Sequence, residues 1–474
     1  MTKRVIIFGA GPAGLAAAYT LVENTKPREL EIILIEQGKR VEERKATSEI
    51  DRAYGVSGVG PYSDGKFLFD TIIGKRQIGS NIHEIAGIEK ELECILKSKE
   101  MFKRFYVPIF GEMKEITPER LRGAEQIKMI AGMNGMDYIV AHDYHIGTDR
   151  LPELMKTIQD YLEKAGVKII TQERVVDFGE KSVRTLDSND QNKDYACDYI
   201  LCAPGRDGSV WLQKTLKEKN IAHKTRPIDI GYRIEADSAV LKRLTDIERD
   251  VKLEFRHPNG DLIRTFCVCP YGKVAVEGKK PEFGGLDFRL VNGASSSVHL
   301  SDNTNFALLV RMPLREDCDN AGLGTGIAEL YKKTGASKIT LQKMGDFKQQ
   351  RSSKSHKIPE WRVRPTLEPE NYLVGDVRIG MSGRILDDLR YGITRLSVPG
   401  LMQGLDGDDT LLYGPEIKMH GVDILTNEFL ESKSMENFFI AGDGTGVSRG
   451  IGGAMASGTL AAEGILKKLG YDLK

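Results

Sequence analysis

Continuous apolar runs separated by glycine and alanine dominate the start of this chain. Residues 5–8 read Val-Ile-Ile-Phe, a run typical of a strand that is buried on both faces of a parallel sheet. An alanine-rich segment from residue 13 to residue 18 has the composition of a helix, and residues 32–35 form a second apolar run. This order predicts a βαβ unit and therefore an α/β fold.

Three glycines lie between the first predicted strand and the helix. Gly9, Gly11 and Gly14 follow the G-x-G-x-x-G spacing of a dinucleotide-binding turn. Gly9 permits the tight turn, Gly11 leaves room for a pyrophosphate against the backbone, and Gly14 lets the helix pack closely on the strand. Pro12 and Ala13 complete this turn at the helix N-terminus, where unpaired N–H groups favour phosphate.

The second predicted strand ends in a carboxylate. Glu36 lies 22 positions after Gly14, which matches the acidic residue that binds a ribose hydroxyl in such folds. A carboxylate there would repel a 2′-phosphate, so the pattern favours FAD or NAD over NADP. Arg44, in the charged turn that follows, is a candidate for contact with the adenosine or diphosphate. The alternative is an exposed arginine on a solvated turn.

The middle of the chain changes its periodicity more than once. Residues 88–97 and 118–129 show helical spacing, and a further helix carries apolar residues at 151, 154, 158 and 162, with Asp149 as its expected cap and Gly166 at its end. Strands are expected at 167–169, 175–178 and 199–202. Short alternating runs at 228–234, 262–269, 273–276 and 307–311 then predict an antiparallel sheet.

A second glycine-rich segment lies near the C-terminus. An apolar strand over 438–440 ends in Gly442 and Asp443, and a loop with Gly450, Gly452 and Gly453 begins the last helix. We therefore expect a Rossmann-like FAD-binding domain with an inserted mixed α+β substrate domain. The expected division is 1–74, 141–226 and 396–474 for the FAD-binding domain, 75–140 for a helical insertion and 227–395 for the antiparallel substrate domain.

Composition narrows the classes of function. The chain has 68 basic and 68 acidic residues among 474, so no overall field favours nucleic acid. No segment approaches about 18 uninterrupted apolar residues, so we expect no transmembrane segment. Six scattered cysteines fit a reducing, cytoplasmic setting. The pair His142 and His145 has no nearby third ligand, so we expect no metal site.

Several motifs taken together resemble the uncharacterised FAD-dependent dehydrogenases of bacteria and archaea, which are related to geranylgeranyl reductases and p-hydroxybenzoate hydroxylases. These motifs are the two glycine-rich ends, the loop over 58–67, and the stretches 229–231, 264–270 and 345–347. The resemblance implies that Ser63, Asp64, Gly65 and Lys66 lie near the flavin and that backbone at Val175 meets the adenine. It also implies that the chain passes back under the dinucleotide at Gly205.

The same resemblance assigns roles to the C-terminal segment. Asp443 would bind a ribityl hydroxyl beside Gly442, and the helix N-terminus at Gly450, Gly452 and Gly453 would point at the pyrimidine edge of the flavin. The positive end of that helix dipole stabilises the negative charge that develops on a reduced flavin.

These features predict a noncovalent FAD oxidoreductase, a dehydrogenase or reductase that transfers hydride between flavin N5 and a small organic substrate. Reduction of a C=C bond is the direction that the reductase relatives favour. No second G-x-G-x-x-G follows a strand, so NAD(P)H would dock transiently or a protein partner would carry electrons. Lys66 and Arg449 are the cationic candidates for catalysis. A flavin monooxygenase and a non-catalytic binding protein are the alternatives.

Cys267 and Cys269 form a C-x-C pair in a predicted strand. Side chains alternate with period two, so both thiols would project from one face, about 7 Å apart and badly oriented for a disulfide. Two packing thiols are therefore expected, with a redox pair as the alternative.

Overall fold

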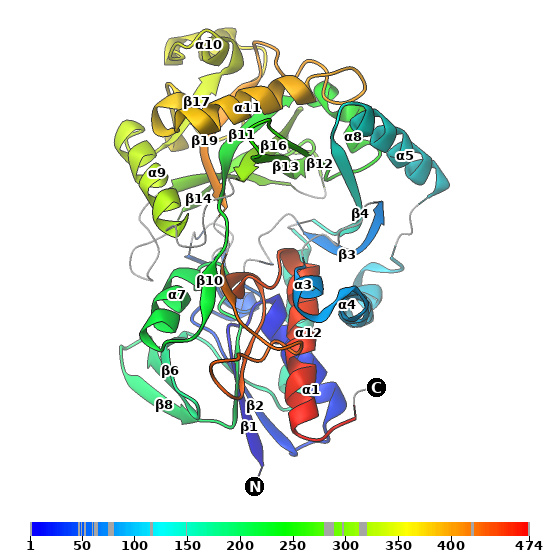
Figure 1. Ribbon diagram of the computed structural model, residues 1–474, viewed down its shortest axis with the longest axis vertical. Helices are drawn as coiled ribbons and strands as arrows, with labels where there is room; N and C mark the ends of the chain where they lie inside the picture. The colour runs from blue at the N-terminus through cyan, green and yellow to red at the C-terminus, as the bar shows by residue number, and fades with distance from the viewer. Residues whose placement is uncertain are drawn as a thin grey trace.

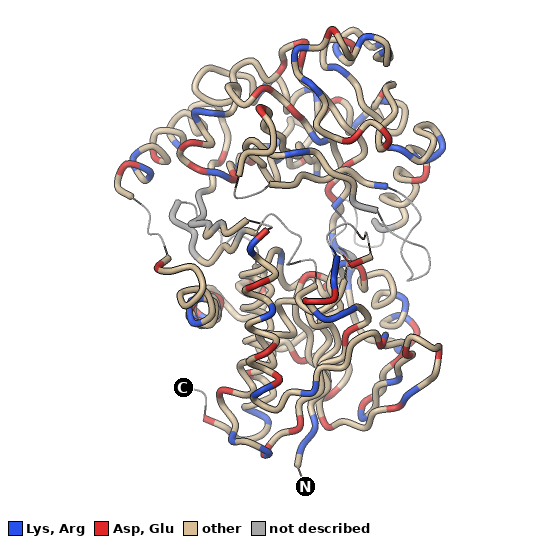
Figure 2. Tube along the Cα trace, turned by 180° about the vertical axis from the view of Figure 1, so that it is seen from behind, with Lys and Arg blue, Asp and Glu red and all other residues tan. Residues whose placement is uncertain are grey.

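The computed structural model describes residues 2–472 except 46–47, 49, 52–53, 59, 61–64, 74–79, 114–116, 148, 279–288, 296–297, 312–319 and 419–420. Two sheets organise these residues into a lower and an upper half (Figure 1), and both chain ends lie in the lower half. Acidic and basic residues are interspersed over both halves (Figure 2), as their equal numbers suggest.

A five-stranded parallel sheet forms the centre of the lower half. Its order is β21-β9-β1-β2-β5, and each neighbouring pair is parallel. The last four residues of β1 are at most 2% exposed, because helices cover both faces of the sheet. The predicted apolar strands are thus confirmed, with these bounds: β1 (Lys3–Phe8), β2 (Leu30–Ile35), β5 (Lys168–Ile170), β9 (Tyr199–Cys202) and β21 (Phe438–Ile440).

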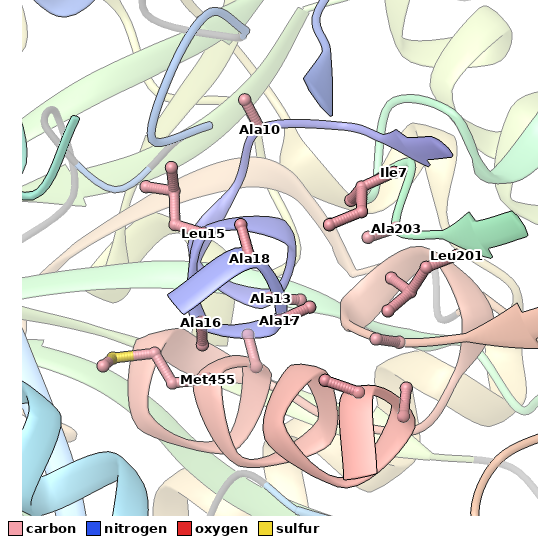
Figure 3. Packing of buried hydrophobic residues seen from close by; sticks show 14 of the residues in the cluster. Ile7, Ala10, Ala13, Leu15, Ala16, Ala17, Ala18, Leu201, Ala203 and Met455 are labelled. Carbon is pink, nitrogen blue, oxygen red and sulfur yellow. The ribbon is translucent and has the colours of Figure 1, made fainter. Parts of the chain in front are cut away.

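The first and last long helices of the chain pack directly on one another beside this sheet. Helix α1 (Pro12–Asn24) presents Ala13, Ala16 and Ala17 to α12 (Gly450–Lys468), as Figure 3 shows. A Cβ added to Gly458 of α12 would lie 2.0 Å from the carbonyl oxygen of Ala13. Only a glycine allows this approach, so the two ends of the sequence are held together by close backbone packing.

A nine-stranded sheet forms the upper half, in the order β18-β17-β19-β11-β16-β13-β12-β4-β3. All neighbouring pairs are antiparallel except β17 with β18. Three of these strands, β3, β4 and β19, lie outside the range 227–395. The bounds are β3 (Lys66–Ile73), β4 (Asp137–His145), β11 (Asp229–Asp237), β12 (Lys252–Arg256), β13 (Leu262–Cys269), β16 (Asn303–Arg311), β17 (Ile339–Lys343), β18 (Tyr372–Val374) and β19 (Leu411–Lys418).

The two faces of the nine-stranded sheet differ in chemistry. One face places Ile230, Tyr232 and Ile234 of β11 in an apolar core with α11 (Gly383–Leu396), which lies across the sheet in Figure 1. Alternation along β11 gives Asp229, Arg233 and Glu235 to the opposite face, and all three are fully buried. The second face therefore buries charge, and each charge needs a partner there.

The remaining elements complete the fold, which confirms the α/β class with a Rossmann-like domain and an inserted mixed domain. Small sheets pair β6 (Glu173–Phe178), β7 (Ser182–Asp187) and β8 (Asn192–Ala196), β10 (His223–Thr225) with β20 (Val422–Ile424), and β14 (Lys273–Gly278) with β15 (Arg289–Ala294). Other helices are α3 (Ile82–Ala86), α4 (Ile88–Phe110), α5 (Pro118–Met133), α6 (Leu151–Lys164), α7 (Ser209–Glu218), α8 (Lys242–Thr245), α9 (Asn320–Thr334) and α10 (Met344–Lys348).

Two helix ends depart from expectation. The residue before α6 is Arg150 rather than Asp149, and the Arg150 side chain makes no capping hydrogen bond. Helix α4 continues to Phe110, well beyond residue 97, because its buried face continues through Met101, Phe102 and Phe105. None of the helices over the described residues has the length and apolar content needed to cross a bilayer.

Candidate functional site

The turn between β1 and α1 has one crowded side and one open side. Gly9 has a φ of +96°, and a Cβ there would lie 2.0 Å from the carbonyl oxygen of Ala203. A Cβ on Gly14 would lie 2.1 Å from the carbonyl oxygen of Gly9, whereas a Cβ on Gly11 would meet nothing within 4 Å. The backbone at Gly11 is therefore the part of the turn that another molecule can approach.

Two helix N-termini at this end of the sheet have no side-chain cap. Gly11 precedes α1 and has no side chain, and Arg449 precedes α12 and has a side chain that carries only donors, so neither residue can cap its helix. The first N–H groups of a helix need acceptors, and the positive end of the helix dipole favours an anionic one. These N-termini fit a ligand that carries a diphosphate and a second electron-rich group.

The two glycine-rich ends of the sequence meet beside β9. The Ala203 N–H donates to the Phe8 carbonyl oxygen at 2.9 Å, and the Ala441 N–H donates to the Cys202 carbonyl oxygen at 3.0 Å. A Cβ on Gly442 would lie 3.2 Å from the Cβ of Ala13. The segment that leads into Asp443 therefore packs against the start of α1.

Asp443 pairs with an arginine from the neighbouring turn. Its carboxylate lies 2.9 Å from Nε of Arg206, and its side chain is 24% exposed. Gly205, just before this arginine, is in close contact with the Asp443 segment, since a Cβ on Gly444 would lie 2.0 Å from the Gly205 carbonyl oxygen. The segments that carry Asp443 and Gly205 are therefore in contact.

Glu36, just after β2, accepts hydrogen bonds from the backbone of the β1–α1 turn and of two later positions. One carboxylate oxygen accepts the Ala10 N–H at 2.9 Å, and the other accepts the N–H groups of Gly38 and Gly55 at 2.9 and 3.0 Å. The side chain is 5% exposed. A carboxylate has about four lone-pair sites, so three are used by the backbone. The sequence pattern pointed to a ribose ligand, and it did not reveal this backbone role.

Arg44 is buried rather than exposed on a solvated turn. Its guanidinium donates to the carbonyl oxygens of Asp51, Val56 and Gly58 at 2.8, 2.6 and 2.7 Å. The Ser57 N–H in turn donates to the Ala10 carbonyl oxygen at 2.7 Å. Arg44 therefore holds the loop before residue 60 against the glycine turn.

The other predicted positions fall in several places. Ser63 and Asp64 lie outside the described residues, as does the Lys66 side chain, while Gly65 is within van der Waals distance of Gly147. Val175 lies on β6, which starts beside Glu36 because the Glu173 N–H donates to the Glu36 carbonyl oxygen at 3.0 Å.

The start of α12 packs against the nine-stranded sheet. Gly450 has a φ of +78°, and a Cβ on Gly452 would lie 2.2 Å from the Leu68 carbonyl oxygen of β3. Gly453 is buried in the next position. These glycines bring the helix N-terminus to the edge of the second sheet.

A cluster of three arginines around one carboxylate lies at this junction. Asp229, fully buried at the start of β11, pairs with Arg264 and also with Arg311, whose Nε lies 2.7 Å from the carboxylate. The guanidinium of Arg449 lies 3.7 Å from the same group. Sequence reasoning singled out Arg449 but missed its partners, because they are up to 220 positions away along the chain.

The electrostatics of this cluster are uneven. The pKa of Arg449 is lowered to about 9, chiefly by burial; the charge of Asp229 opposes this effect, and the charges of Arg264 and Arg311 add to it. Burial also lowers the pKa of Arg311, but the charge and hydrogen bonds of Asp229 outweigh it and raise that pKa overall. A second carboxylate, that of Glu254, lies 4.0 Å from Arg264, so two carboxylates and three guanidiniums meet at this junction.

Metal ligands do not gather in the part of the chain that the structure describes. No group of three or more His, Cys, Asp or Glu side chains there could hold an ion. The side chains of His142 and His145 are not among those described.

Comparison with known sequences gives one distant relative. An uncharacterised protein of Clostridium beijerinckii (strain ATCC 51743 / NCIMB 8052) is 24% identical over 503 residues, which cover 99% of this chain and 81% of that protein. No protein-family model matches the chain.

Solved structures with a similar fold include a flavoprotein/dehydrogenase, an oxidase and a dehydrogenase. A flavoprotein/dehydrogenase from Cytophaga hutchinsonii is 11% identical with a TM-score of 0.41, over 99% of this chain and 80% of that one. Pyridoxine 4-oxidase from Mesorbium loti is 12% identical with a TM-score of 0.42, over the whole of both chains. L-proline dehydrogenase from P. horikoshii is 12% identical with a TM-score of 0.42, over 99% and 94%. The function proposed below therefore rests on this chain's own residues.

Proposed function

We propose that this chain binds FAD noncovalently and is an oxidoreductase for a small organic substrate, in the group of FAD-dependent dehydrogenases that its motifs resemble. The observation that carries the proposal is the meeting of the two glycine-rich ends. Gly11 is open at the N-terminus of α1, and Gly442 packs on Ala13 of the same helix. An NAD-only domain has no need of a second glycine-rich segment that returns to its first strand from over 400 residues away.

Each part of FAD has candidate partners in this arrangement. The N-terminus of α1 at Gly11 would hold the diphosphate, and the remaining lone pair of Glu36 would accept a ribose hydroxyl. Asp443 would accept a ribityl hydroxyl. The uncapped N-terminus of α12 would face the pyrimidine edge of the flavin, where its dipole stabilises negative charge.

When bound, FAD would supply flavin N5 as the acceptor or donor of a hydride that moves from or to a substrate carbon. The protein's own contribution is to orient the substrate and to balance charge. Three guanidiniums, those of Arg264, Arg311 and Arg449, gather around Asp229, and such a group favours a substrate with a carboxylate or phosphate group. A C=C bond next to such a group is the substrate class that we propose.

The source of electrons is a separate part of the proposal. The chain has no second G-x-G-x-x-G turn after a strand. NAD(P)H would therefore dock transiently without a Rossmann domain of its own, or a protein partner would deliver the electrons. Hydride transfer from NAD(P)H would need the nicotinamide C4 to lie close to flavin N5 and to be oriented toward it.

The test uses the purified full-length protein. We expect a yellow protein that releases one FAD per chain on heat denaturation, and we expect NADH, NADPH or a reduced electron-transfer protein to bleach the flavin band under anaerobic conditions. A colourless protein that also fails to bind added FAD would overturn the proposal. Oxygen insertion into a substrate on reoxidation would instead show a monooxygenase.

A further inference from the structure

The two cysteines of β13 are closer together than their spacing on a regular strand allows. The register between β13 and β16 shifts between Phe266 and Cys269, and Cys267 has a φ of +49° in the left-handed region. This bulge brings the Cys267 and Cys269 sulfurs to 4.0 Å from one another. The expectation of two thiols about 7 Å apart is therefore wrong, because it assumed an unbroken strand.

A fully buried arginine lies against this pair. The guanidinium of Arg233 donates to the Cys267 carbonyl oxygen at 2.7 Å and lies 3.5 Å from the Cys269 sulfur. It also lies 3.2 Å from both oxygens of Glu416, and Nζ of Lys418 lies 3.1 Å from the same carboxylate. The Arg233 guanidinium thus lies in contact with the Cys269 sulfur, and a cation at this distance favours a thiolate over a thiol.

The two thiols differ in access. Cys267 is partly exposed, whereas Cys269 is fully buried. The other described cysteines are single and buried, and burial raises the pKa of Cys94 to about 12 and that of Cys197 to about 11. Of the described cysteines, only the β13 pair has a nearby second thiol together with a cation. No third ligand that could make this pair a metal site is present among the described residues.

We propose that Cys267 and Cys269 form a redox-active dithiol that reduces disulfides. The Cys267 thiolate attacks one sulfur of a substrate disulfide, which forms a mixed disulfide and releases one substrate thiolate. The Cys269 thiolate, held beside Arg233, then attacks the Cys267 sulfur. An intramolecular disulfide forms, and the second substrate thiolate leaves. The protein pair loses two electrons and two protons, and the substrate disulfide gains them.

The test places the full chain in buffers with increasing shares of oxidised over reduced glutathione. Acid stops exchange, free thiols are alkylated, and trypsin releases residues 265–273 as one peptide, since it cleaves after Arg264 and Lys273. We expect this peptide to change from two alkyl groups to none, with the loss of two hydrogen atoms. The peptides with Cys94, Cys197 and Cys202 should stay alkylated. A peptide that keeps both alkyl groups in fully oxidised glutathione would overturn the proposal.

Single substitutions separate the two roles. Cys269→Ser removes the second nucleophile, so a mixed disulfide with glutathione should accumulate on Cys267. Cys267→Ser leaves only the buried thiol of the pair, so the glutathione adduct should form at least about tenfold more slowly than in Cys269→Ser. Cys197→Ser is the matched control and should leave oxidation of the 265–273 peptide unchanged. Equal adduct formation in Cys267→Ser and Cys269→Ser would contradict the assignment. Because no readout uses FAD, this outcome is independent of the proposed function.

Discussion

The two sheets of this protein differ in the groups that they present: backbone N–H groups at the parallel sheet and charged side chains at the antiparallel sheet. Strand β1 is apolar on both faces, and the turn after it offers backbone at Gly11. Strand β11 has one apolar face and one that buries Asp229, Arg233 and Glu235. The parallel sheet therefore presents N–H groups and helix N-termini, whereas the antiparallel sheet presents side-chain charge. Substitutions can therefore test these two kinds of group separately.

The largest expected effect is on the buried charge of the nine-stranded sheet. Glu416→Leu leaves the fully buried Arg233 without its carboxylate, and we expect it to cost about 3–5 kcal/mol in the free energy of unfolding. Urea denaturation measures this. Adding Arg233→Met to Glu416→Leu should recover part of the loss. A cost below about 1 kcal/mol for the single change would show that the sheet tolerates an unpaired buried cation.

The next effect compares two glycines of the β1–α1 turn. Gly14→Ala places a Cβ 2.1 Å from the Gly9 carbonyl oxygen, and this overpacking should cost about 1–3 kcal/mol. Gly11→Ala meets open space at a φ of −70° and should change stability by less than about 0.5 kcal/mol. Equal losses of unfolding free energy in the two variants would contradict the division into a crowded and an open side.

A third effect is the pH dependence of the upper half. Burial raises the pKa of Asp388 from 3.8 to about 6, and the neighbouring Asp261 carboxylate adds to the rise. The folded state therefore holds this proton more tightly than the unfolded state, so its contribution to stability is present at low pH and is lost as pH rises from about 4 to about 6.

Asp388→Asn tests this sign. The amide supplies a permanent N–H toward Asp261 without a charge, so the variant should be more stable than the parent at pH 7, by about 2 kcal/mol. The difference should shrink toward pH 4 in urea titrations at a series of pH values. Asp387→Asn, at an exposed neighbouring side chain, is the control. A variant that is less stable than the parent at pH 7 would contradict the account.

The smallest effect belongs to the parallel sheet. Ile7→Val removes one buried methyl group from β1 and should cost about 0.5–1.5 kcal/mol. The loss should not depend on pH, because no titratable group is involved, and thermal unfolding at pH 5 and pH 7 checks this. A loss that varies with pH would show that the apolar sheet is coupled to the charged one.

The difference between the parallel and the antiparallel sheet also explains which features could be predicted from the sequence. Runs such as residues 5–8 and the glycine spacing predicted the parallel sheet and its turn, because both signals are local. The nine-stranded sheet pairs β3, β4 and β19 with strands far along the chain, and local patterns carry no record of such partners. For the same reason Arg264 and Arg311 were not predicted to join Arg449 at Asp229.

Local geometry that departs from a regular strand or helix could not be predicted from the sequence either. The bulge at Cys267 changes the distance between two sulfurs without any change in the C-x-C spacing. The three carbonyl contacts of Arg44 arise from the course of a loop, and neither charge nor position revealed them.

The central claim is that two ends of the sequence, more than 400 residues apart, build one FAD site. Titration of FAD into the apoproteins of Gly11→Val, Asp443→Ala and the parent tests it directly, with Glu436→Ala at an exposed position as control. We predict that both Gly11→Val and Asp443→Ala weaken binding roughly tenfold to a hundredfold, while Glu436→Ala binds as the parent does. Parent-like FAD affinity in folded Gly11→Val and Asp443→Ala would contradict the claim.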